Sequence, residues 1–156
     1  MTAKQELRAL LDAADDELNA LLDSLAPDEW ERRTATRDRW TVRETVSHIV
    51  TGEAGNLAIA RGIAEGKDMY RPDFDLDRYN RRAIEKSAHR SPEDLRADLR
   101  ARRQETLAFL EQLDEAALQR AGRRTTGERT TVAEVFRRIA EHQREHAAEI
   151  RAAVGR

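Results

Sequence analysis

Hydrophobic residues recur at intervals of three and four along four stretches of the chain, and each stretch predicts one long amphipathic helix. In the first stretch, leucines and alanines between Leu7 and Leu25 form a single apolar stripe. Thr2 and Gln5 precede this stripe with the spacing of a capping box, and Pro27 follows it. Because proline disfavours helical geometry in the preceding residue, we expect this helix to end near Ala26.

The other three helices are predicted from the same kinds of signal. Thr41 and Glu44 form a capping box before a stripe that ends near Gly66, and Thr131 and Glu134 form another before the last stripe. Pro92 stands at the first position of the third helix, where proline is favoured. The apolar positions of these three helices are Val42, Val46, Ile49, Val50, Leu57 and Ile63; Leu95, Leu99, Thr106, Leu110 and Leu113; and Val132, Val135, Phe136, Ile139, Ile150 and Val154.

The connections between these helices differ in length. Residues 67–90 predict an ordered crossover with a short helix from Arg78 to Ser87, and a loop is expected around Gly122 and Gly127. The run from Leu25 to Glu44 also parallels the run from Leu113 to Glu134, which indicates two related helical hairpins, although Thr-Val-x-Glu is also simply a good helix start. We therefore predict an all-α, single-domain protein over residues 1–156. The domain is a four-helix bundle with a long crossover between helices 2 and 3.

Charge and composition narrow the function classes. The 28 basic and 30 acidic residues nearly cancel, so we expect neither nucleic acid nor a membrane surface as a partner. The chain has no cysteine, and any metal must therefore be held by nitrogen and oxygen. The sequence shows no signal-peptide pattern and no apolar run near ~18 residues, which predicts a cytoplasmic protein.

Three of the four histidines form the best chemical clue in the sequence. His142 and His146 are four residues apart on the last helix, so their imidazoles leave the same helix face about 6 Å apart along the axis. His48 lies on the second helix, beside the small residues Gly52 and Gly55. Three nitrogen ligands from two helices leave a coordination position open, as in catalytic metal sites.

Other interpretations of these residues stay open. The histidines can instead be partly exposed groups with ordinary hydrogen bonds, and His89 is expected at the surface. The run from His142 to His146 matches His-x-x-Glu-His, but a peptidase-sized scaffold is absent, and the paired Glu-x-x-His motifs of di-iron bundles are missing. Glu145 and Glu149 are candidates to support the site, as a general base or as partners of the ligands.

The chain resembles the DinB/YfiT-like superfamily over nearly its whole length. The resemblance is carried by the run from Trp40 to Ile49, by Asn80 in the crossover, and by the run from Glu141 to His146. It implies an up-down-down-up four-helix bundle in which His48, His142 and His146 bind nickel, zinc or a similar divalent ion. It also implies that a low-molecular-weight thiol is a co-substrate in some relatives, and that homodimers are common.

Two classes of function follow from this resemblance and from the histidines. The first is a metal-dependent enzyme that acts on a small molecule. Thiol S-transferase activity is the more specific form of this hypothesis, and a metal-dependent hydrolase is the alternative. The second is a non-enzymatic, stress-associated dimeric bundle. The sequence identifies neither the metal, the thiol nor a general base.

Overall fold

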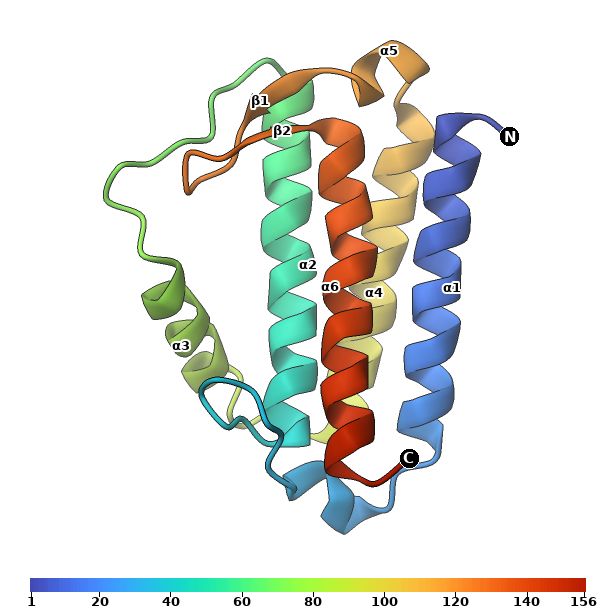
Figure 1. The fold of residues 1–156 in the computed structure, drawn as a ribbon, viewed down its shortest axis with the longest axis vertical. Coiled ribbons are helices and arrows are strands. Elements are labelled where there is room, and N and C mark those ends of the chain that lie inside the picture. Colours follow the sequence, from blue (N-terminus) through green and yellow to red (C-terminus); the bar gives the residue numbers. More distant parts are fainter.

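The computed structural model describes residues 1–156 and is built around four long helices (Figure 1). They are α1 (Ala3–Asp23), α2 (Val42–Ala64), α4 (Pro92–Gln112) and α6 (Val132–Ala153). In Figure 1, α1 and α6 run in one direction while α2 and α4 run in the other. The predicted all-α four-helix bundle, its up-down-down-up order and its long crossover between α2 and α4 are confirmed.

Shorter elements fill the connections. They are the 3-10 helix η1 (Pro27–Glu31), α3 (Leu76–Lys86), α5 (Glu115–Leu118), β1 (Ala121–Arg123) and β2 (Arg129–Thr131). Helix α3 lies in the crossover and packs on α2. The segment predicted as a loop is partly an antiparallel hairpin, in which Gly122 pairs with Thr130 and Gly127 takes a positive φ of 92° in the turn. Strands of three polar or small residues give no alternating pattern, so the sequence did not reveal this hairpin.

Hydrogen bonds at the helix starts confirm the predicted capping boxes. The side chains of Thr2, Thr41 and Thr131 each accept a hydrogen bond from the backbone N–H three residues later. Ser91 caps α4 in the same way, at a start that was predicted from Pro92 alone. The two helical hairpins also share a backbone hydrogen bond at the start of their second helix. The N–H of Val42 donates to the carbonyl of Arg32, and the N–H of Val132 donates to that of Arg120. The echo between the two halves of the sequence is therefore present in the backbone.

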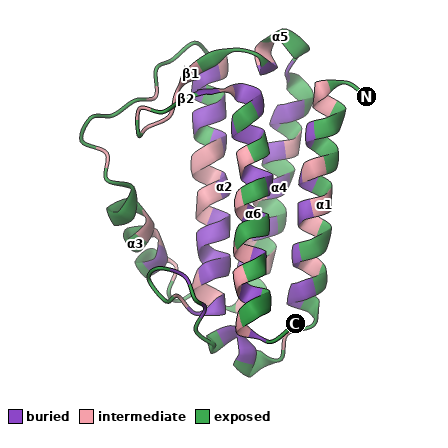
Figure 2. Cartoon of the chain, in the orientation of Figure 1, coloured by how far each residue is buried: buried purple, intermediate pink, exposed green.

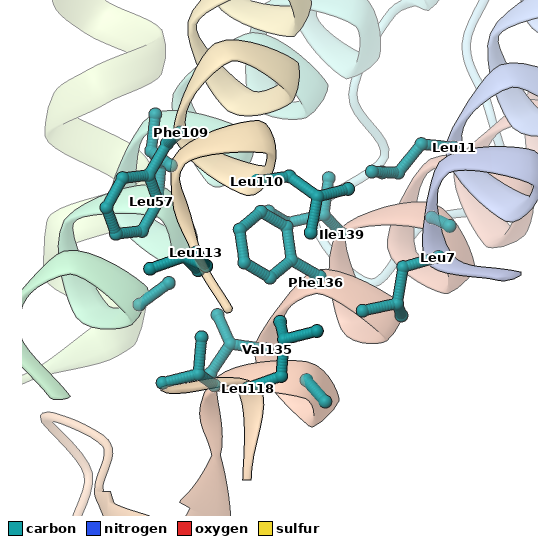
Figure 3. Packing of buried hydrophobic residues seen from close by; sticks show 14 of the residues in the cluster. Leu7, Leu11, Leu57, Phe109, Leu110, Leu113, Leu118, Val135, Phe136 and Ile139 are labelled. Carbon is teal, nitrogen blue, oxygen red and sulfur yellow. The ribbon is translucent and has the colours of Figure 1, made fainter. Parts of the chain in front are cut away.

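Buried positions occur along the whole length of the four long helices (Figure 2). The hydrophobic ones form two clusters, one toward each end of the bundle. The larger cluster has Phe136 and Leu110 near its centre, and Leu11 reaches toward them from α1 (Figure 3). The smaller cluster joins the other ends of the same helices around Val46, Leu95 and Ile150. The predicted apolar stripes of α4 and α6 are buried at every position.

A layer of buried polar side chains separates the two clusters, and the sequence analysis missed it. The guanidinium of Arg103 donates to the carboxylate of Glu53, to the amide oxygen of Gln143 and to the backbone carbonyl of Leu11. Thr106 donates a further bond of 2.7 Å to Glu53. One network thus ties all four long helices together, and its buried charges are paired, as buried charges must be. It also fixes α6 against α2 one residue away from His142.

Candidate metal centre

The structure brings His48, His142 and His146 together at the contact between α2 and α6. The Nε2 atom of His142 lies 2.9 Å from that of His48 and 3.1 Å from that of His146. One ring nitrogen from each residue falls within 4.8 Å of the others. His48 is buried, and the other two are half-buried. The fourth histidine, His89, is exposed and lies outside this group.

The residues of α6 that follow the two histidines are the ones buried in the bundle. Gln143 and Ala147 occupy these buried positions. His142 and His146 each precede one of these buried residues and face α2 instead of the apolar core. This placement keeps them accessible while the polar layer holds the helix that carries them.

The spacing and protonation of the imidazoles fit a divalent cation. Two nitrogens bound to one ion at about 2.0–2.1 Å are roughly 2.9–3.4 Å apart for bond angles between 90° and 110°, close to the two separations that Nε2 of His142 makes. Burial, together with a smaller contribution from charge repulsion by His146, lowers the pKa of His48 to about 4. Burial also lowers the pKa of His142 to about 2, with smaller contributions from the neighbouring histidines and arginines. Both rings are therefore neutral at neutral pH, the form that ligates metals.

A carboxylate orients the third imidazole. Nδ1 of His146 lies 2.8 Å from Oε2 of Glu149, so its N–H donates to the carboxylate and Nε2 is left free to face the other histidines. Glu149 therefore takes the supporting position considered from the sequence. Glu145 pairs instead with Arg138 through two hydrogen bonds of 2.8 and 3.2 Å.

Trp40 covers another side of the histidines. Its ring centroid is 4.6 Å from that of His48 and 6.5 Å from that of His146. A tight loop sets its position, because the backbone carbonyl of Trp40 accepts from Thr34 and its N–H donates to Oγ1 of Thr36. Arg39, just before it, adopts a positive φ of 52°. Trp40 was recognised in the sequence as part of a motif, but its contact with the site depends on this loop.

Gly52 allows α2 to approach the histidines of α6 closely. A Cβ atom at this position would lie 2.8 Å from Cε1 of His142, which is closer than van der Waals contact permits. Next to it, a cavity of about 620 Å³ opens beside His48 and His142. Gly55, Asn56 and Ile59 line this cavity, because they share a face of α2 with His48.

The outer wall of the cavity comes from segments that the sequence analysis left without a role. Met69, Tyr70, Phe74 and Tyr79 belong to the crossover and α3, while Arg124 follows β1. A hydrogen bond of 3.0 Å from Arg71 N–H to the carbonyl of Thr125 joins crossover and hairpin. The one available signal was the concentration of aromatic residues between residues 70 and 79.

A second cavity, of about 750 Å³, lies between α3 and the first half of α2. It is the larger of the two, but it contains none of the three histidines. Its lining is dominated by charged side chains such as Arg78, Arg82 and Lys86, which are exposed. We therefore place the candidate site in the cavity that reaches the histidines, where a ligand-binding group and a concave surface coincide.

The fold and the histidine cluster define an all-α bundle with a three-histidine candidate metal centre. The sequence matches the DinB superfamily from residue 3 to residue 150, and the chain belongs to this superfamily. A search among curated proteins finds no sequence match.

Several solved structures share the fold. The mycothiol-dependent maleylpyruvate isomerase has a TM-score of 0.80 at 13% identity; the match covers 96% of this chain but only 63% of the isomerase. The YfiT protein of Bacillus subtilis, described as a probable metal-dependent hydrolase with an unusual four-helix bundle topology, has a TM-score of 0.74 at 18% identity, covering 97% of this chain and 87% of YfiT. These likenesses show the fold, whereas chemistry must be argued from the site.

A third similar structure corrects one expectation from the sequence. The colibactin self-resistance protein ClbS, in complex with a dsDNA, has a TM-score of 0.78 at 18% identity, covering 96% of this chain and 94% of ClbS. Excluding nucleic acid from the partners was therefore wrong. The physical reason is that net charge averages over the whole surface, whereas binding depends on local charge. No helix in the structure has the length and apolar character needed to cross a membrane.

Proposed function

We propose that this protein is a divalent-metal-dependent enzyme that acts on a small molecule and uses a low-molecular-weight thiol as co-substrate. His48, His142 and His146 would hold the ion. The observation that carries the proposal is the convergence of three imidazole nitrogens at the edge of a cavity. Such a donor set accepts nickel, zinc or another first-row ion.

A divalent ion bound there would lower the pKa of a thiol or water and stabilise developing negative charge. The chain's own residues would do the rest. Glu149 orients His146, and Trp40 shields His48 from solvent on one side. The cavity beside Gly55 and Asn56 would hold the second substrate close to the histidines. S-transfer to an electrophilic carbon is the reaction that we favour for this arrangement.

Metal-assisted hydrolysis is the second candidate. It is supported by the likeness to YfiT, whose description is that of a probable metal-dependent hydrolase. It uses the same three histidines, with water in place of the thiol. The two candidates differ in their products, because a hydrolase needs no thiol for turnover.

Elemental analysis tests the metal first. Protein purified without chelator should contain about one equivalent of a divalent metal, and the His142→Ala/His146→Ala variant should contain none. His89→Ala is the matched control, since it removes an exposed histidine outside the cluster. If neither the parent nor parent dialysed against nickel, zinc or manganese holds metal, the proposal fails and a non-enzymatic role is favoured.

Activity is tested with the metal-loaded protein and a set of electrophiles, with and without mycothiol, bacillithiol or glutathione. Product that contains the thiol supports the S-transferase. Turnover that is independent of thiol supports the hydrolase. Activity that survives in the His142→Ala/His146→Ala variant would contradict both.

A further inference from the structure

Arg124 lies in the same cavity as His48 and His142, and it has no carboxylate partner. Its side chain is half-buried between the hairpin turn and α2, and it donates a hydrogen bond to Oδ1 of Asn56. Glu128 attracts its positive charge and raises its pKa slightly, but the two side chains form no ion pair. Because a guanidinium carries five N–H donors, a single bond to Asn56 leaves several free for a ligand.

Two of the neighbouring arginines are already neutralised, and a third, Arg71, lines the cavity from an exposed position. Arg138 also lines the cavity, but it pairs with Glu145 through two hydrogen bonds. Arg123, the residue before Arg124, pairs with Asp68 and lies over the ring of Tyr70. Burial lowers the pKa of Arg124, which means that its surroundings do not favour its positive charge. An anion in the cavity would supply the missing compensation.

Asn56 sets the direction of the guanidinium. Its Nδ2 donates a 3.0 Å hydrogen bond to the backbone carbonyl of Gly52, one turn earlier on α2. This bond turns Oδ1 toward Arg124, so the arginine is held by a side chain that is itself fixed to a helix. The cavity lining also includes the apolar and aromatic groups of Met69, Phe74 and Tyr79.

We propose that the substrate of this site carries a carboxylate or phosphate group, and that Arg124, held by Asn56, binds that group. The rest of the molecule would lie along the aromatic wall, with its reacting atoms beside the three histidines. This inference rests on the proposed function for its catalytic meaning, but anion binding by Arg124 can be measured without any reaction. A charge-assisted hydrogen bond of this kind contributes about ten- to hundredfold in affinity.

Calorimetric titration of the zinc-loaded protein with three matched probes tests the inference. The probes are 3-phenylpropionate, its uncharged amide 3-phenylpropionamide, and 2-phenylethylphosphonate. We expect at least one anion to bind about tenfold or more tightly than the amide. The order of the two anions shows whether the site prefers a carboxylate or a phosphate-like group.

Variants at Arg124 test whether this residue causes the preference for anions over the amide. Arg124→Gln should bind the anions and the amide equally, whereas Arg124→Lys, which keeps the charge, should retain part of the preference. Arg129→Gln removes an equal charge from an exposed position of the same hairpin and should behave as the parent. Circular dichroism of each variant establishes that the fold is retained.

Repeating the titration after chelation separates this inference from the proposed function. A preference for anions that survives without metal and disappears in Arg124→Gln supports it even if the metal proposal fails. A preference that vanishes with the metal and is unchanged in Arg124→Gln places the anion on the metal and overturns it. Equal binding of acid and amide, or binding of no probe in the millimolar range, also overturns it.

Discussion

Replacing Gly52 by alanine tests whether the close contact between α2 and α6 is essential for the candidate metal centre. The added methyl group would lie 2.8 Å from Cε1 and 3.3 Å from Nδ1 of His142. His142 would have to move by about 0.6 Å to reach ordinary contact, and its helix is held in place by the polar layer around Arg103. We therefore expect His142 to lose its alignment with His48 and His146.

Two opposing effects determine how Gly52→Ala changes the free energy of unfolding. Alanine in place of glycine in a helix interior stabilises the fold by up to about 1 kcal/mol, whereas overpacking costs about 1–3 kcal/mol. Metal-free Gly52→Ala should thus unfold at the same or lower urea concentration than the parent. Misaligned ligands should weaken metal binding by about ten- to hundredfold, the range found when ligand orientation is disturbed.

Competition between the protein and a zinc-sensitive chelating dye measures the affinity, and urea unfolding in EDTA measures the stability. Gly55→Ala is the matched control, because the nearest atom to its added Cβ is the hydroxyl oxygen of Tyr79 at 3.7 Å. This control should gain helix stability and bind metal like the parent. If Gly52→Ala binds metal as tightly as Gly55→Ala, the steric argument is refuted.

Three further predictions concern the support of the site. Glu149→Gln should weaken metal binding by about ten- to hundredfold in the same dye assay, because His146 loses its charged hydrogen-bond partner; an unchanged affinity would contradict that role. Arg103→Leu should lower the free energy of unfolding by about 3–5 kcal/mol in urea, and Glu53→Leu/Arg103→Leu should recover much of it, because the single change leaves a buried carboxylate unpaired. Metal-free protein should lose stability as the pH falls below about 6.5, by about 1.4 kcal/mol per pH unit for each depressed histidine. The sign follows because the unfolded chain takes up protons there while His48 and His142, with pKa values of about 4 and 2, stay neutral in the folded state; His48→Gln/His142→Gln should flatten the slope.

The helices and the three histidines were predictable because their signals are local. A capping box such as that of Thr41 and Glu44, and the four-residue spacing of His142 and His146, are complete within one stretch of sequence. The cavity was predictable only in part. Gly55 and Asn56 share a helix face with His48, whereas the position of Arg124 depends on a hairpin that sequence periodicity does not record.

The polar layer is reflected in the sequence as gaps in the apolar stripes of two helices. Between Leu99 and Thr106, the apolar stripe of α4 has a gap, and Arg103 stands where the next buried residue belongs. A similar gap in α6, between Ile139 and Ile150, contains Gln143. A gap of this kind identifies a buried position, but its partner Glu53 on another helix is known only from the folded structure.

The likeness between the two helical hairpins has a consequence for symmetry at the histidine cluster. Gly52 and His142 occupy equivalent positions, each eleven residues after the threonine that starts its helix, and they face each other where α2 and α6 cross. Two large side chains cannot both occupy a point where equivalent positions meet. The repeat must therefore be broken there, with hydrogen on one helix and an imidazole on the other. A duplicated hairpin thus yields a one-sided centre, with one ligand from α2 and two from α6.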